Sequence, residues 1–297
     1  MRKFLSIVAC ISVLFILFTS CANMEDGELL SHSSHSGFDD NKNITVVARE
    51  SESGTRNIFN KHYKISTEGT GGVIDDKTVS SAIISTSTVS VMNKIKDNEY
   101  AVGYISMGSH TNDVKVLKVD GVTPNQNNIK DGSYKNTCPF NLITKGDVTG
   151  LKKDFIDFII SHEGQTVIGK EYHKEHEDAA KHNSETKYEG KLTVGGSSAM
   201  APIMQKLIDE YKKHNEKAEI ELRTSNSKTG ITGADNGSLD IGLSVRELTT
   251  TEKTSLKETK IATDAIIVIV NKNNNKTDIT SNEVMRIFTG EITSWKF

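Results

Sequence analysis

The stretch LTVGGSSAMAPIMQKLIDEYKKH, residues 192–214, combines three local signals in one order. It opens with a short β-branched run at 192–194, passes through two glycines and two serines, and continues with apolar residues at helical spacing. This pattern predicts a strand, a tight turn and an amphipathic helix. The same alternation recurs from residue 44 to residue 289, which predicts an α/β fold.

The other expected elements are short and follow one another closely. Strands are expected at 44–49, 100–106, 114–119, 140–144, 219–223 and 239–243, and helices at 54–62, 86–97, 151–161, 165–172, 229–236 and 281–289. The last helix has Thr280 or Ser281 as its cap and Glu283 in its first turn. The apolar run 261–270 is long enough for one strand, or for two joined by a bend, that crosses between lobes.

The first 21 residues have the features of a secretory signal. Two basic residues precede the apolar run 4–18, and small residues lead to Cys21. This resembles the signal peptide of a bacterial lipoprotein, so we expect palmitate at Cys21; simple secretion and an uncleaved anchor helix are the alternatives. Each places the remaining chain outside the cytoplasmic membrane. Residues 22–43 are too polar to fold alone and are expected to form a flexible tether.

Composition excludes several classes of protein. The 297 residues carry a formal net charge of -3 and show no basic stripe, so no nucleic-acid partner is expected. Of the three cysteines, Cys10 lies in the signal and Cys21 is the lipid site, which leaves Cys138 alone. A disulfide framework is therefore excluded.

Three turns combine serine, threonine and glycine between a strand and a helix. They lie at 49–56 (RESESGTR), 195–200 (GGSSAM) and 225–230 (SNSKTG). Such turns direct free backbone N–H groups and the positive end of a helix dipole at one point, which favours an anion; simple helix capping is the alternative. Because loops at the carboxyl ends of strands meet at one crevice of an α/β sheet, the three could contact one ligand.

Other chemistries lack their motifs. There is no nucleotide-binding GxxxxGK[ST] or GxGxxG pattern and no GxSxG nucleophile turn. The histidines at 32, 35, 173, 176 and 182 lie in polar segments, where a solvated face is favoured over a zinc site. We expect no catalytic residue, metal or cofactor.

Five segments together resemble the phosphate-binding proteins of bacterial phosphate ABC importers, the PstS family. They are ITVVARESESGTRNIF, VGGSSAMAPIMQKLIDEY, TGITGADNGSLDIGLSVREL, IATDAIIVIVN and IFTGEITSW, within residues 44–297. The family has the GGSS-like segment first and the RESESGTR-like segment later, so the order is exchanged here. This is typical of a circular permutation, with residues 173–190 as the linker between the family's old ends.

The resemblance implies a two-lobed, periplasmic-binding-protein-like (type II) fold with crossover strands around an anion cleft. Lobe I is expected at 107–265, and lobe II at 44–106 plus 266–297, which requires both ends of the folded chain to lie together. A monomer is expected. The alternative, fragments of two gene copies fused together, predicts domain-swapped oligomers.

The resemblance also implies the ligand residues. They are Arg49, Ser53, Gly54, Thr55, Ser198, Ala199 and Ser227. Two positions depart from the family pattern: Val245 replaces an acidic residue or serine, and Glu52 replaces a glycine. A carboxylate that accepts a hydrogen bond from the ligand favours a protonated anion over sulfate. Glu50, Glu52 and Asp264 are the alternatives for this acceptor carboxylate.

The implied function is a lipid-anchored extracytoplasmic protein that captures inorganic phosphate and delivers it to the permease and ATPase subunits of an ABC importer. It is not expected to be an enzyme, because the turns supply donors without a paired general acid and base. A receptor or adhesion lipoprotein with a degenerate site, a binder of another tetrahedral oxyanion, and an exported phosphate-ester hydrolase are the alternatives.

Overall fold

The computed structural model describes residues 37–69, 74–183 and 185–297. Residues 38–297 form one compact unit. The expected signal peptide, the lipid site at Cys21 and most of the tether lie outside the described residues. Within these described ranges, no helix is long and apolar enough to cross a membrane.

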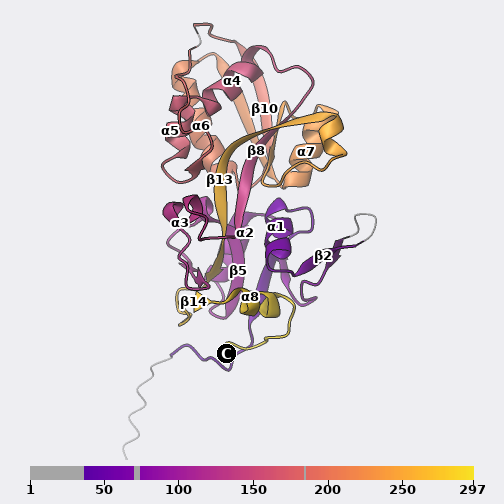
Figure 1. Ribbon diagram of the computed structural model, residues 1–297, viewed down its shortest axis with the longest axis vertical. Helices are drawn as coiled ribbons and strands as arrows, with labels where there is room; N and C mark the ends of the chain where they lie inside the picture. The colour runs from indigo at the N-terminus through magenta and orange to yellow at the C-terminus, as the bar shows by residue number, and fades with distance from the viewer. Residues whose placement is uncertain (1–36, 70–73, 184) are drawn as a thin grey trace, which may run out of the picture. The chain divides into compact units, whose positions relative to one another are not determined.

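A ten-stranded mixed sheet runs through this unit, in the order β11-β10-β12-β8-β13-β5-β1-β4, with β6 and β9 also pairing with β13 (Figure 1). Its strands are β1 (Thr45–Arg49), β4 (Ile83–Ser85), β5 (Ala101–Ser106), β6 (Lys115–Val116), β8 (Thr137–Lys145), β9 (His173–Lys174), β10 (Gly190–Ser197), β11 (Ala218–Ser225), β12 (Ile241–Ser244) and β13 (Leu256–Val270). Two small sheets pair β2 (Ser66–Glu68) with β3 (Ile74–Asp76), and β7 (Lys118–Val119) with β14 (Asp278–Ile279).

Strand β13 connects the two halves of the molecule. It is one strand, five residues longer at its start than the apolar run predicts, with an irregular register between Lys260 and Ala262. Its first part pairs with β8 as far as Ala265, and its last part pairs with β5 from Ile266 onward. In Figure 1, β8 and β13 pass from one lobe into the other. The expected two-lobed α/β fold with crossover strands is confirmed.

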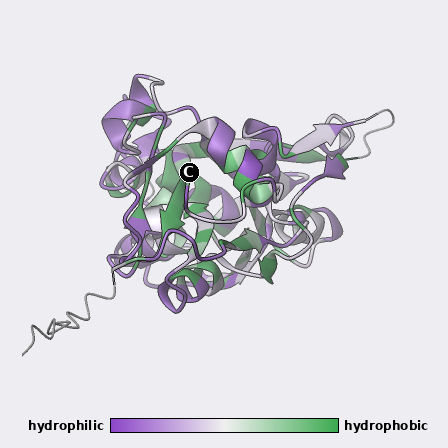
Figure 2. Ribbon diagram, turned by 90° about the horizontal axis from the view of Figure 1, so that it is seen from below, coloured by the Kyte–Doolittle hydropathy of each residue, from purple (hydrophilic) through white to green (hydrophobic). Residues whose placement is uncertain are grey.

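Helices cover the sheet in both lobes. They are α1 (Gly54–His62), α2 (Thr88–Lys96), α3 (Gln126–Lys130), α4 (Gly150–Ile160), α5 (His162–Ile168), α6 (Ala201–His214), α7 (Ser227–Asn236) and α8 (Ser281–Phe288). Figure 2 shows hydrophobic strands inside and hydrophilic helix surfaces outside. Helix α8 has the expected start, since the side chain of Thr280 accepts from the amide of Glu283 while the Glu283 side chain accepts from the amide of Thr280.

Residues from both ends of the folded unit lie side by side. The amide of Ile44 donates to the carbonyl of Thr293 at 2.8 Å. Phe38 packs against the rings of Tyr100 and Trp295, with centroids 5.1 and 6.0 Å apart. The prediction of a tether as far as residue 43 was therefore wrong at its end, because an aromatic contact holds the polar segment 38–43 against the folded unit.

Two further segments differ from expectation. Strand β6 pairs with residues 269–270, and β7 pairs with β14. Residues 115–119 therefore lie beside the C-terminal segment, whereas the sequence analysis places them in lobe I, which it begins at residue 107. We propose β8 as the better lobe boundary.

Parts of the expected linker are also held more firmly than a run of charged residues predicts. His173 and Lys174 pair with β13. The His182 side chain is 7% exposed and lies 3.1 Å from the Asp154 carboxylate, with Phe158 packed edge-on against its ring. The prediction that His182 lies on a solvated face was therefore wrong. Asp154 and Phe158 on α4 give its ring a buried environment that the local sequence does not reveal.

Candidate functional site

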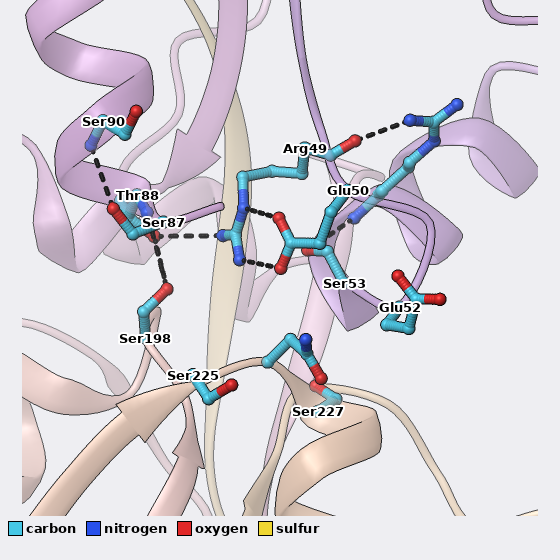
Figure 3. Close-up of polar contacts among 12 residues, drawn as sticks. Arg49, Glu50, Glu52, Ser53, Ser87, Thr88, Ser90, Ser198, Ser225 and Ser227 are labelled. Atoms are coloured by element: carbon cyan, nitrogen blue, oxygen red, sulfur yellow. Dashed lines mark hydrogen bonds and ion pairs between the residues drawn. The ribbon is translucent and has the colours of Figure 1, made fainter. Parts of the chain in front are cut away.

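The three predicted turns meet between the lobes. Gly54, at the start of α1 in one lobe, lies so close to the other lobe that a Cβ added to it would be 2.4 Å from Ser227 Oγ and 2.8 Å from Val245 Cγ2. Ser198, which follows β10, contacts Thr88 at the start of α2 in the opposite lobe. Figure 3 shows the Arg49 guanidinium between Glu50 and Thr88, with Ser198, Ser225 and Ser227 of the other lobe on the same side of the cluster.

The first turn combines a strand end with a helix start. Arg49 ends β1, where its amide donates to the hydroxyl of buried Tyr104 at 3.1 Å. Ser53 caps α1 by accepting from the amide of Arg56 at 3.3 Å. Thr55 is 2% exposed, and among the described residues its hydroxyl has no hydrogen-bond partner. Capping and free donor groups therefore coexist in this turn.

Arg49 is a buried cation whose guanidinium is held closely by Glu50 and more weakly by Thr88. It is 2% exposed. Its Nε and Nη2 each donate to a carboxylate oxygen of Glu50 at 2.8 Å, and its Nη1 is directed at Thr88 Oγ1, 3.4 Å away. Glu50 thus neutralises Arg49 and fixes its plane, which leaves Nη1 to face the centre of the cluster.

The second and third turns supply hydroxyls from the other lobe. Ser198 and Ala199 lie between β10 and α6, and the carbonyl of buried Ala199 accepts from Ser109 Oγ at 3.5 Å. Helix α7 begins at Ser227, two residues earlier than expected. Ser227 is fully buried, and its Oγ accepts from the amide of Val245 at 3.2 Å. Val245 therefore orients Ser227 through its backbone while its side chain packs near Gly54.

The three carboxylates considered as acceptors have different surroundings. Glu52 is exposed, and a hydrogen bond from Ser51 lowers its pKa. Asp264 lies inside β13, where it accepts from Ser106 Oγ and from backbone amides, and burial raises its pKa to about 7. Of these three carboxylates, Glu50 is the one for which the described residues show a hydrogen bond to the Arg49 guanidinium. Geometry therefore favours Glu50 over the other two.

Sequence reasoning missed a fourth turn at Ser85–Thr88, between β4 and α2. The Thr88 hydroxyl of this turn contacts Arg49 Nη1, and the Thr88 amide reaches Ser198 Oγ. The run STST before an amphipathic helix is a signal of the same kind as the other turns, although the short strand β4 before it was not recognised.

The arrangement favours an oxyanion over a metal. Hydroxyls, helix N-termini and one guanidinium are donors to negatively charged oxygen. Within the part of the chain that the structure describes, no three His, Cys, Asp or Glu side chains come together as metal ligands.

Comparisons with known proteins agree with this chemistry. A model of the PBP superfamily domain matches residues 31–163 and 179–297. The phosphate-binding protein PstS 2 of Streptococcus agalactiae is 39% identical over 297 residues, which cover 99% of this chain and 97% of that protein. The chain belongs to the PstS family. Because one match runs along nearly the whole of both chains, this member and the S. agalactiae PstS 2 share one order of segments.

The PstS-family chain is also similar to a solved structure. The phosphate-binding protein of a phosphate ABC transporter from Streptococcus pneumoniae has 36% sequence identity and a TM-score of 0.68, and the match covers 85% of this chain and 98% of that one. The PstS of Bacillus subtilis is 32% identical over 126 residues, 41% of each chain.

Proposed function

We propose that this PstS-family chain is a lipid-anchored, extracytoplasmic solute-binding protein that captures inorganic phosphate and passes it to the permease and ATPase subunits of an ABC importer. It acts without chemical turnover. The observation that carries the proposal is the approach of Gly54 to Ser227 and Val245, because it brings donor turns of two lobes around one point. The S. agalactiae and S. pneumoniae relatives, both named for phosphate binding, support the choice of ligand.

The proposed ligand residues come from both lobes. They are Arg49, Ser53, Gly54, Thr55, Ser198, Ala199 and Ser227. Glu50 serves as the acceptor for a protonated phosphate oxygen, because its carboxylate retains lone pairs beside the Arg49 guanidinium. A fully deprotonated anion such as sulfate has no proton to donate to the Glu50 carboxylate and is repelled by its charge, so the site binds sulfate more weakly.

The segment order is proposed to be a circular permutation, with a monomer as the working form. The partial match to the B. subtilis PstS supports this, since a linear comparison of permuted chains recovers only part of each. Contact between Ile44 and Thr293 within one chain also supports a monomer, because a domain swap is not needed to bring the ends together.

Calorimetric titration of the chain with inorganic phosphate tests the function. We expect saturable one-to-one binding that excess sulfate does not abolish. A chain that takes up no phosphate at millimolar concentration is instead a receptor or adhesion protein on this scaffold. Stronger binding of sulfate than of phosphate would assign the site to another tetrahedral oxyanion.

A further inference from the structure

The turn between β4 and α2 presents donor groups that the protein itself engages only weakly. Ser87 caps α2 by accepting from the amide of Ser90 at 3.1 Å, so Thr88 is the first helical residue. The Thr88 amide reaches Ser198 Oγ at 3.4 Å, and its hydroxyl lies 3.5 Å from the same atom. These separations exceed the common range for hydrogen bonds of either type, so both donors are poorly used.

A second observation comes from Ser85, at the end of β4. Ser85 is 2% exposed, and within the described ranges its Oγ has no hydrogen-bond partner. It is paired in register with Arg49 on the parallel neighbour β1. Because paired residues of neighbouring strands project to the same face of a sheet, this hydroxyl lies on the side of the Arg49 side chain. A buried hydroxyl without a partner is costly to keep unless a ligand satisfies it.

The weakly engaged Nη1 of Arg49 connects this turn to the proposed phosphate position. Two of its three nitrogens are occupied by Glu50, and the remaining Nη1 lies 3.4 Å from Thr88 Oγ1 (Figure 3). An oxyanion that binds Nη1 on the side of Thr88 therefore lies within reach of the Thr88 hydroxyl. Ser198, which comes from the other lobe, lies beside the same hydroxyl, 3.5 Å away.

We propose that Ser85–Thr88 is a fourth ligand loop of the anion site, in which the amide and hydroxyl of Thr88 and the hydroxyl of Ser85 donate to a tetrahedral oxyanion. The inference rests on the proposed function and extends it. Thr88 replaces its long contacts with Ser198 by shorter, charge-assisted hydrogen bonds to the ligand, so the loop binds the anion and joins the two lobes through it.

The test is a titration of the full chain and its variants with inorganic phosphate. Thr88→Val keeps the shape of the side chain and removes its hydroxyl. We expect its Kd to rise about tenfold or more, as for the loss of a hydrogen bond to a charged group. Thr88→Ser retains the hydroxyl and should stay within about threefold of the unaltered chain. Thr86→Val is the matched control, because Thr86 lies in the same turn and is exposed.

Ser85→Ala provides an independent variant in case Thr88→Val folds poorly. It removes a hydroxyl that has no partner within the described ranges, so the melting temperature without phosphate should not fall, while the Kd rises about three- to tenfold. Wild-type affinity in both Thr88→Val and Ser85→Ala would overturn the fourth loop and leave the proposed function intact. Absence of phosphate binding by the unaltered chain would overturn both.

Discussion

Replacing Gly54 with alanine tests whether the two lobes meet over the ligand. Gly54 is the first residue of α1, and its φ lies outside the left-handed region, so alanine can adopt this backbone conformation. The added methyl group would lie 2.4 Å from Ser227 Oγ and 2.8 Å from Val245 Cγ2. Ordinary contacts between non-bonded carbon atoms are about 3.5–4.0 Å, so the lobes must separate by about 1 Å.

The cost of that separation falls on the arrangement in which the two lobes meet at Gly54. Ser227 cannot simply turn away, because its Oγ accepts from the amide of Val245. Overpacking of this kind costs about 1–3 kcal/mol, and a stretched hydrogen bond to a charged ligand adds to it. We therefore expect a loss of about 2–3 kcal/mol in binding, which is about a 30- to 150-fold rise in Kd.

Calorimetry and thermal melting with and without phosphate measure this loss. A ligand at 100 times its Kd stabilises a protein by about 2.7 kcal/mol, and a hundredfold weaker Kd reduces this to about 0.4 kcal/mol. Gly54→Ala should therefore lose most of the phosphate-induced rise in melting temperature. Gly37→Ala is the control, since a Cβ at Gly37 meets nothing within 4 Å. A wild-type Kd in Gly54→Ala would refute the reasoning.

Three more variants separate selectivity, protonation and stability. Glu50→Gln removes the negative charge that repels a fully deprotonated anion. Sulfate should then compete with phosphate at about tenfold lower concentration than in the wild type. Unchanged competition by sulfate would show that Glu50 does not determine selectivity. Burial raises the pKa of Asp264 to about 7, so the folded chain binds this proton more tightly than the unfolded chain does, and stability falls as pH rises from about 4 to 7. Asp264→Asn should remove that fall, which melting at several pH values between 4 and 8 checks; an identical pH profile would contradict it. His182→Ala breaks the buried contact with Asp154 and should lower the melting temperature by about 4–8 °C, for a loss of about 2 kcal/mol, without changing the phosphate Kd.

Much of the fold could be predicted from the sequence because its signals are local. Apolar periodicity specifies α6, and periodicity together with a capping residue specifies α8, each within one or two residues of its observed bounds. The part of β13 before residue 261 was missed, because its sequence LKETK is polar and becomes a strand through pairing with β8. His182 was misread for a similar reason, since its buried partner Asp154 is 28 residues away.

The sequence by itself determined the α/β alternation and the three Ser/Gly turns that open helices, because backbone caps and helix starts depend on residues a few positions apart. Only the tertiary structure decided that Gly54 lies against Ser227, and that Thr88 faces Ser198 across 110 positions of the chain. The physical reason is that a ligand site between two lobes is built from contacts between distant segments. Sheet register and the crossing of β8 and β13 set those contacts, and neither is encoded in any single stretch of sequence.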